Sequence, residues 1–186
     1  MNTLSKVALG VALMISAGLS PAYGQGLEFS LGGGLSLPVG SFGNTATTGW
    51  HGLAGISYGR GPFGLRVDGA LNRFGLDNQG GPDLDIQTQV IHGTANAVYK
   101  FGRSAESKLR PYVLGGAGVY QTKETGDDAD AGDTADFGVN AGVGFDFKAG
   151  AIGAFLEGRF HNIFMMGTDT NSAFIAFTIG VRLGGN

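Results

Sequence analysis

The sequence predicts an all-β fold, an eight-stranded antiparallel up-and-down transmembrane β-barrel. Three observations support this fold class. From Gln25 onward, apolar residues recur at every second position, which is the period of a β-strand. The 186-residue chain, a length typical of one domain, contains 36 glycines and no cysteine. Its mean hydropathy is +0.10, yet no apolar run beyond the N-terminus is long enough for a membrane-spanning helix.

Composition excludes several classes of protein. Without cysteine, the chain can form neither a disulfide scaffold nor a thiolate metal site. A net charge of -3 and a pI near 5.5 argue against a nucleic-acid partner. The hydropathy is too high for a disordered chain. We expect no cofactor.

The first 24 residues have the pattern of a secretory signal peptide. Lys6 precedes an apolar stretch over residues 7–19, and small residues stand at the positions that precede cleavage before Gln25. The alternative, an N-terminal anchor helix, needs a longer apolar stretch. We therefore assign residues 1–24 as the signal peptide and residues 25–186 as the barrel domain. Removing Lys6 leaves 11 Lys and Arg against 15 Asp and Glu, a net charge of -4.

Strands are expected wherever the alternation is clear. It is clearest in residues 137–148, where Phe and Val alternate with Gly, Asn, Asp and Lys, and it recurs in residues 27–37 and 175–183. Five further strands are expected at about 48–59, 62–75, 86–101, 110–122 and 151–166, and we expect no helix. The longer links are 38–47, 76–85, 123–135 and 167–172, and the short ones are 60–61 and 149–150, with 102–109 intermediate. This alternation of link lengths is typical of a barrel with loops at one rim and turns at the other.

The composition of the two faces indicates which one lies inside. The polar face carries mostly Gly, Ser, Asn and Ala, which suit the narrow interior of an eight-stranded barrel. The other face carries Phe, Val, Leu and Ile, as contact with lipid requires. Trp50 and Tyr58 share this apolar face, and eight residues along a tilted strand correspond to roughly 20 Å across the membrane. They are candidate girdle aromatics, with ordinary packing as the alternative.

Charged residues separate by rim. The long links and their edges hold ten of the fifteen acidic residues, and the short links hold Arg60, Arg103, Lys108 and Arg110. If the mature chain starts in the periplasm, the acidic rim faces outside. The acidic set comprises Asp77, Asp83, Asp85, Glu124, Asp127, Asp128, Asp130, Asp133, Asp169 and, at the edge of a strand, Asp136.

Five segments together resemble the eight-stranded outer-membrane protein beta-barrel family, the group similar to the transmembrane domain of OmpA and to OmpX. They are residues 34–43 (GLSLPVGSFG), 110–120 (RPYVLGGAGVY), 138–145 (GVNAGVGF), 157–161 (EGRFH) and 179–183 (IGVRL). The resemblance covers residues 25–183. It implies insertion by the barrel-assembly machinery into the bacterial outer membrane. Chains of this kind often end in an aromatic residue, whereas here Leu183 holds that place before Gly184, Gly185 and Asn186.

Inward-facing charges are expected to pair, because an unpaired buried charge is costly. Arg66 and Asp68 share one face of the third strand, and Glu157, Arg159 and His161 share one face of the seventh. We expect these five residues to form a lumen charge network that plugs the barrel, with the first four as its core.

An enzymatic alternative follows from the resemblance. Some barrels of this kind remove acyl chains from lipid A with His, Ser and Glu on the outer face, and Glu157 and His161 are similar to part of that set. Ile163 stands where the serine is needed, and the sequence has no Gly-x-Ser-x-Gly elbow. Because a nucleophile must lie within reach of its base, we expect no catalytic residues.

Two metal-binding hypotheses are open. The segment that holds Asp127, Asp128, Asp130 and Asp133 has carboxylates at alternate positions before Gly132, as in a calcium loop, but the later glutamate of an EF-hand is missing. A solvated loop is the alternative to weak divalent-ion binding there. The three histidines, His51, His92 and His161, lie on different strands without ligand spacing, so no metal site is assigned to them.

The predicted role is that of an outer-membrane barrel with a structural or surface-interaction function, a closed polar lumen and acidic extracellular loops. Its expected partners are outer-membrane lipid, lipopolysaccharide and the assembly machinery, and the barrel is expected to be monomeric. One alternative is binding or narrow-channel, porin-like passage of a small molecule. Another is a soluble periplasmic ligand-binding barrel. A wide aqueous pore needs about 16 strands.

Overall fold

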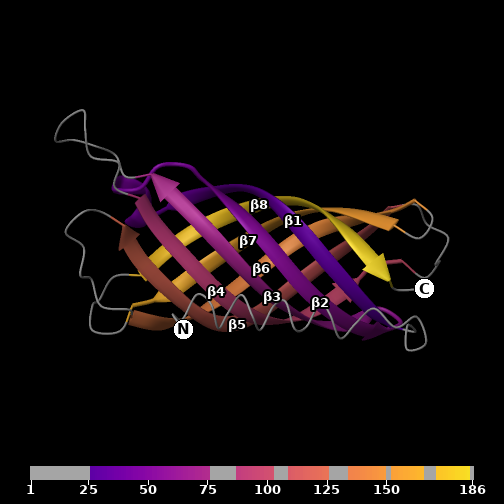
Figure 1. The fold of residues 1–186 in the computed structure, drawn as a ribbon. Coiled ribbons are helices and arrows are strands. Elements are labelled where there is room, and N and C mark those ends of the chain that lie inside the picture. The colour runs from indigo at the N-terminus through magenta and orange to yellow at the C-terminus, as the bar shows by residue number, and fades with distance from the viewer. Residues whose placement is uncertain are drawn as a thin grey trace, which may run out of the picture.

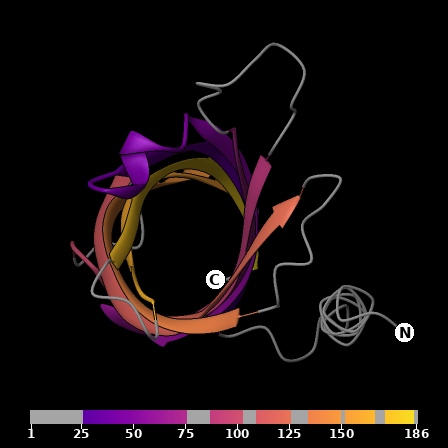
Figure 2. The ribbon, with the colours of Figure 1, turned by 90° about the vertical axis from the view of Figure 1, so that its left-hand side faces the viewer.

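The chain forms a closed barrel of eight antiparallel strands. The computed structural model describes residues 26–75, 87–102, 109–125, 134–149, 152–165 and 171–184. Each strand pairs with its neighbours in the sequence, and β8 pairs with β1 to close the ring (Figures 1 and 2). The strands are β1 (Leu27–Val39), β2 (Gly49–Arg60), β3 (Phe63–Gly75), β4 (Gln87–Lys100), β5 (Leu109–Thr125), β6 (Thr134–Ala149), β7 (Ile152–Phe164) and β8 (Asn171–Gly184). The predicted fold class is confirmed.

Four strands, β1, β5, β6 and β8, extend further toward the long links than the apolar pattern predicts. β5 continues to Thr125, and β6 begins at Thr134, so that Thr122 pairs with Thr134. The reason is that backbone pairing does not require apolar side chains, whereas the prediction followed apolar alternation. The link between β1 and β2 also contains a 3₁₀ turn, η2 (Phe42–Asn44), where no helix was expected. Within the described ranges, no helix has the length and apolarity needed to cross a membrane.

The two ends of the barrel differ in the length of their connections. The links β1–β2, β3–β4, β5–β6 and β7–β8 meet at one end, here called the loop end, and the links β2–β3, β4–β5 and β6–β7 meet at the other, here called the turn end. The β2–β3 link is a tight turn in which Gly61 has a φ of +66°, a conformation open to glycine. Residues 59–64, which match a dinucleotide-binding string, therefore form a hairpin rather than a phosphate loop.

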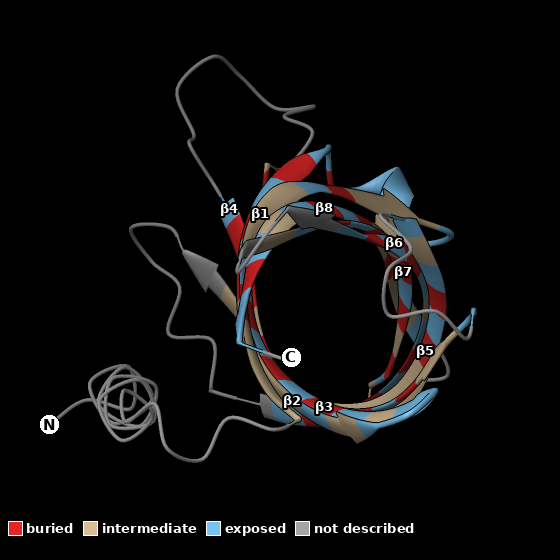
Figure 3. Ribbon diagram, turned by 90° about the vertical axis from the view of Figure 1, so that its right-hand side faces the viewer, coloured by how far each residue is buried: buried red, intermediate tan, exposed pale blue. Residues whose placement is uncertain are grey.

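Side chains alternate between lumen and exterior as the sequence predicts. Along β6, Phe137, Val139 and Val143 are exposed, whereas Asn140 and Asp146 are buried. The same alternation of buried and exposed residues runs along the other strands of the ring (Figure 3). The exterior is thus apolar around the barrel, and closure pairs the strand edges, which is what lipid requires of a β-structure.

The lumen is filled by large side chains rather than by small ones. Tyr112, Tyr120, Phe155 and Phe174 all point inward and are at most 1% exposed. Inward-facing glycines make room for these rings: a Cβ at Gly144 would overlap Tyr112, one at Gly138 would lie 2.6 Å from the Tyr120 ring, and one at Gly180 would overlap Phe155. Glycine on the lumen face therefore serves the packing of a large residue from another strand.

Candidate functional site

Four buried charged residues meet in the lumen. Arg66 and Asp68 project from β3, and Glu157 and Arg159 project from β7. Arg66 contacts Asp68 at 2.9 Å and Glu157 at 2.9 Å, while Arg159 contacts Asp68 at 3.0 Å and Glu157 at 2.6 Å. All four side chains have a relative exposure of 0–1%. We call this set the four-charge cluster; it has two positive and two negative groups.

The four-charge cluster crosses the full width of the barrel. In a closed ring of eight strands, β3 and β7 are four strands apart in either direction, so they lie on opposite walls. Ion pairs between Arg66 and Glu157 and between Arg159 and Asp68 therefore span the lumen. Further hydrogen bonds support the carboxylates: Tyr112 Oη donates to Glu157 Oε2 at 2.7 Å, and Asn96 Nδ2 donates to Asp68 Oδ2 at 3.0 Å.

Alternation explains why these residues meet, and burial explains their mutual dependence. Within β3 and within β7, the two charges are two residues apart, so they share the inward face. Moving a charged side chain from water into the protein interior costs on the order of several kcal/mol. Close opposite charges and additional hydrogen bonds offset that cost. Any one of the four groups would be unstable at this position without the others.

His161, the fifth residue of the predicted network, has different partners. It points inward but lies two residues nearer the loop end than Arg159, among rings. Its imidazole stacks on Phe174 with centroids 4.5 Å apart, lies 4.9 Å from the His92 ring, and shares a hydrogen bond of 2.9 Å between Nδ1 and Tyr120 Oη. We call His92, Tyr120, His161, Phe74 and Phe174 the ring cluster. It fills the lumen toward the loop end, and Phe42 of η2 packs on Phe74 at 5.1 Å.

His51, the third histidine, belongs to a hydrogen-bonded group of lumen side chains that Asn72 connects to His92 of the ring cluster. His51 Nδ1 shares a hydrogen bond of 3.0 Å with Ser36 Oγ, and His51 Nε2 shares one of 2.9 Å with Thr178 Oγ1. Asn72 Nδ2 lies 3.3 Å from His92 Nδ1. Across the described ranges, no group of three or more His, Cys, Asp or Glu side chains is arranged to hold a metal ion.

A second group of charges, which the sequence reasoning missed, lies near the turn end. Arg182 of β8 contacts Glu28 of β1 at 2.7 Å and Asp146 of β6 at 3.0 Å. Lys100 of β4 contacts Asp146 at 3.1 Å and Glu28 at 3.5 Å. The Arg182 guanidinium also lies 4.7 Å from the Phe155 ring and 5.0 Å from the Tyr112 ring. We call Glu28, Lys100, Asp146 and Arg182 the turn-end cluster.

The turn-end cluster could have been found from the alternation. Each of its four residues stands at an inward position near the rim of short links, and an inward charge needs an opposite charge at the same height. The interaction of Glu28 with Arg182 joins the first and last strands, so it also stabilises the seam at which the barrel closes.

The two candidate girdle aromatics both lie outside the barrel. Trp50 is 53% exposed and Tyr58 is 49% exposed, near opposite ends of β2. Trp50 pairs with Arg73 of β3, whose guanidinium lies 5.7 Å from the indole ring, and Tyr58 pairs with Leu65. Their placement suits two membrane interfaces, and their role as girdle anchors stays a prediction.

Most of the predicted charged rim lies outside the described residues. This applies to the candidate divalent-ion loop with Asp127, Asp128, Asp130 and Asp133, and to Arg103 and Lys108. The predicted signal peptide also lies outside the described residues. Asp136, which was assigned to the edge of the acidic rim, instead lies within β6, points inward and is 3% exposed. Arg110 lies in β5 and is half-buried, whereas Arg60 is exposed at the turn end.

A closed eight-stranded barrel with an apolar exterior and an ion-paired lumen defines the class of small transmembrane β-barrels. The family model described as "Outer membrane protein beta-barrel domain" matches residues 8–184. The chain therefore belongs to this family, as the resemblance implied, and the family is one of the bacterial outer membrane. No curated protein sequence matches the chain.

Solved structures agree on the fold. The chain is similar to Neisserial surface protein A, with a TM-score of 0.62 and 18% identity over 86% of this chain and 97% of that one. It is similar to Ail, the attachment invasion locus protein of Yersinia pestis, with a TM-score of 0.52 and 16% identity over 86% and 99%. It is also similar to the outer membrane enzyme PagL, with a TM-score of 0.51 and 16% identity over 84% and 99%.

Proposed function

We propose that this protein is a sealed outer-membrane barrel with a structural and surface-interaction role. It displays its loops at the surface, and solutes do not pass through its lumen. The observation that carries this proposal is the four-charge cluster, whose ion pairs run from β3 to β7 across the lumen. The ring cluster above it and the turn-end cluster below it add two further layers of packed side chains. Outer-membrane lipid is the expected surrounding, and the assembly machinery is the expected partner during insertion.

The residues considered for lipid A hydrolysis lie in the wrong place for that reaction. Glu157 and His161 point into the lumen, where Glu157 is ion-paired with two arginines and His161 is stacked on Phe174. The lipid-facing positions of β7 carry Leu156, Gly158, Phe160, Asn162 and Phe164. No acyl chain in the membrane can reach the two lumen residues without unpacking the barrel, and this supports a non-enzymatic role.

The apolar exterior also supports a membrane barrel over a soluble periplasmic one. Leu65, Ile179 and Phe63 are each at least 65% exposed, and such side chains encircle the structure. A soluble protein with an exterior of this kind would aggregate. Heat-modifiable migration of the protein in the membrane fraction is the expected result, whereas recovery in the soluble periplasmic fraction would refute the proposal.

Planar-bilayer conductance tests the seal. The native barrel should give no steady channel steps. Replacing Glu157 and Arg159 together by alanine removes one charge of each sign and opens space across the lumen, so conductance should rise. Leu156→Ala, on the lipid-facing side of the same strand, is the matched control and should behave as the native protein does. Steady steps from the native barrel would favour the alternative of narrow-channel transport.

A further inference from the structure

The exterior carries a row of amphipathic and polar side chains at the loop end. Trp50 of β2 pairs with Arg73 of β3, Arg73 pairs with Gln89 of β4, and Gln89 pairs with Lys123 of β5. All four stand at outward positions of their strands, and directly paired residues of neighbouring strands have Cβ atoms about 5 Å apart. The row is therefore continuous over the four neighbouring strands β2 to β5, and because the strands are tilted it rises toward the loop end from Trp50 to Lys123.

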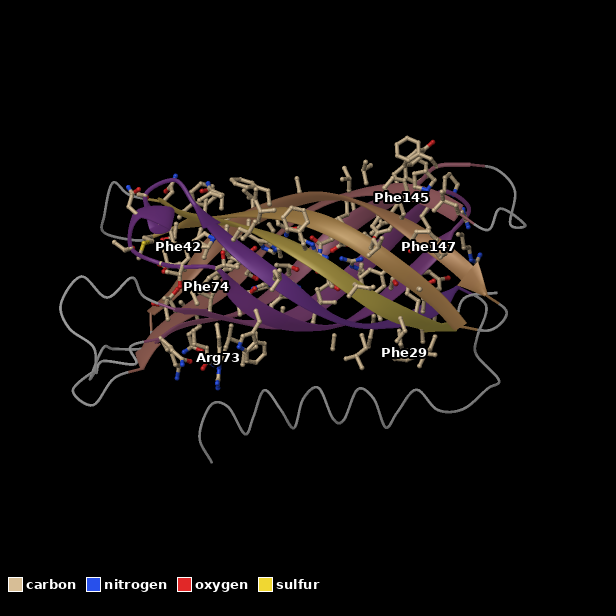
Figure 4. The ribbon with its side chains drawn as sticks, turned by 90° about the horizontal axis from the view of Figure 1, so that it is seen from above. Phe29, Phe42, Arg73, Phe74, Phe145 and Phe147 are labelled. Carbon is tan, nitrogen blue, oxygen red and sulfur yellow. The ribbon has the colours of Figure 1, made fainter. Side chains whose placement is uncertain are left out.

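Arg73 is exposed and points away from the barrel. Figure 4 shows it directed outward at the same end as Phe42 and Phe74. Within the described part of the chain, the Arg73 guanidinium lies 5.7 Å from the centre of the Trp50 indole ring. This contact leaves the N–H edge of the guanidinium available to an acceptor.

A shallow hollow of about 320 Å³ adjoins this arginine. Leu35 and Trp50 line it with apolar surface, and Arg73, Thr48 and Gln87 line it with polar groups. Gly75, at the outward position after Arg73, also lines the hollow. A hollow with an apolar floor and a cationic rim suits the junction between the headgroup and the acyl chains of an anionic amphiphile.

The position of the row across the membrane identifies the leaflet. In barrels of this class, short turns lie in the periplasm and longer loops lie outside, so the loop end faces the outer leaflet. Trp50, the candidate girdle aromatic of this end, is expected at the interface there, since tryptophan is enriched at the level of the headgroups. A positive charge at that level is stabilised by an anionic headgroup, and the guanidinium matches the geometry of phosphate oxygens in a bidentate contact.

We propose that Arg73, with Trp50 and Gln87, forms a binding site for the phosphate of a phosphorylated glycolipid of the outer leaflet. The guanidinium donates to the phosphate, the Gln87 amide hydrogen-bonds to the sugar, and the acyl chains run along the apolar exterior past Leu71 and Leu35. Gln89 and Lys123 extend the polar row toward a second headgroup. The site is separate from the sealed lumen and does not depend on its role.

Trp50 makes the site directly measurable, because it is the single tryptophan of the chain. The refolded full-length protein in zwitterionic detergent micelles is titrated with diphosphorylated lipid A while tryptophan fluorescence is followed. A saturable change is expected. Lipid A from which the phosphates have been removed should need a concentration at least tenfold higher for half-saturation, and millimolar inorganic phosphate alone should produce no change.

Variants separate the proposed contact from general attraction to lipid. Arg73→Gln should raise the half-saturation concentration about tenfold or more, and Arg73→Lys, which keeps the charge but loses the bidentate geometry, should raise it less. Arg60→Gln removes an exposed arginine from the other rim of β2 and should leave the titration unchanged. Heat-modifiable migration verifies that each variant is folded.

Three results would overturn the proposal. The first is an equal response to the phosphorylated and dephosphorylated lipids, a comparison that needs only the native protein and stands even if Arg73→Gln fails to fold. The second is a folded Arg73→Gln variant with native affinity. The third is the same fluorescence change with inorganic phosphate alone, which would assign the site to a free anion rather than to a lipid headgroup.

Discussion

Replacing Arg159 by leucine tests the four-charge cluster most directly. Arg159 contributes a pair of contacts to Glu157 Oε1, at 2.9 and 2.6 Å, and one to Asp68 Oδ2, at 3.0 Å. In the variant, two buried carboxylates share the single guanidinium of Arg66, so one negative charge is uncompensated. Breaking a buried ion pair in this way costs about 3–5 kcal/mol.

The cost appears as a shift in the urea midpoint of the folded barrel in lipid. For a denaturant dependence of about 2 kcal/mol/M, a loss of about 3–5 kcal/mol lowers the midpoint by roughly 1.5–2.5 M. Adding Glu157→Gln restores neutrality with Arg66 and Asp68 and keeps an acceptor for Tyr112, so the double variant should recover part of the loss. Arg60→Leu, at an exposed rim position, should change stability by no more than about 0.5 kcal/mol.

Either of two outcomes would contradict a stabilising role for the four-charge cluster. If Arg159→Leu has the midpoint of Arg60→Leu, the ion pairs across the lumen do not stabilise the barrel. If Glu157→Gln lowers the midpoint of Arg159→Leu by as much as it lowers that of the native protein, the two residues act independently.

Three further predictions concern other parts of the chain. Arg182→Met should lower the urea midpoint by an amount similar to Arg159→Leu, because both of its carboxylate partners lose a buried cation. An unchanged midpoint would mean that the turn-end cluster does not stabilise the barrel. Gly144→Ala should destabilise the barrel by about 1–3 kcal/mol, because its Cβ would overlap Tyr112, whereas Gly52→Ala, with nothing within 4 Å, should be neutral by the same measurement. Amino-terminal sequencing of the protein from outer membranes should begin at Gln25, and an intact Met1 would refute the signal peptide.

Much of the fold was predictable because its physical cause is local. A strand places successive side chains on opposite faces, so the apolar alternation in residues 137–148 already separates lipid-facing from lumen-facing positions. Link lengths then distinguish the loop end from the turn end. The exact strand ends were not predictable, because Thr122 and Thr134 pair through their backbones without any apolar signal.

The four residues of the four-charge cluster were predictable from the sequence, whereas the partners of His161 were not. Alternation places Arg66, Asp68, Glu157, Arg159 and His161 on the inward faces of their strands. The inward face of one strand carries several residues, and the position of a residue along the strand decides which side chains it contacts. His161 is two residues from Arg159, a rise of roughly 6–7 Å along a strand. That step moves it from the charges to the rings of Tyr120 and Phe174.

By itself, the sequence determined that this is an all-β chain, which residues face lipid, and that inward charges must be paired. These properties follow from the two-residue period of a strand and from the cost of an isolated buried charge. Only the closed barrel decided which charges meet, since β3 and β7 become opposite walls through the order and register of all eight strands. Closure likewise brought Glu28 to Arg182, 154 positions away. Contacts of this range depend on the sum of all the registers, which no local pattern contains.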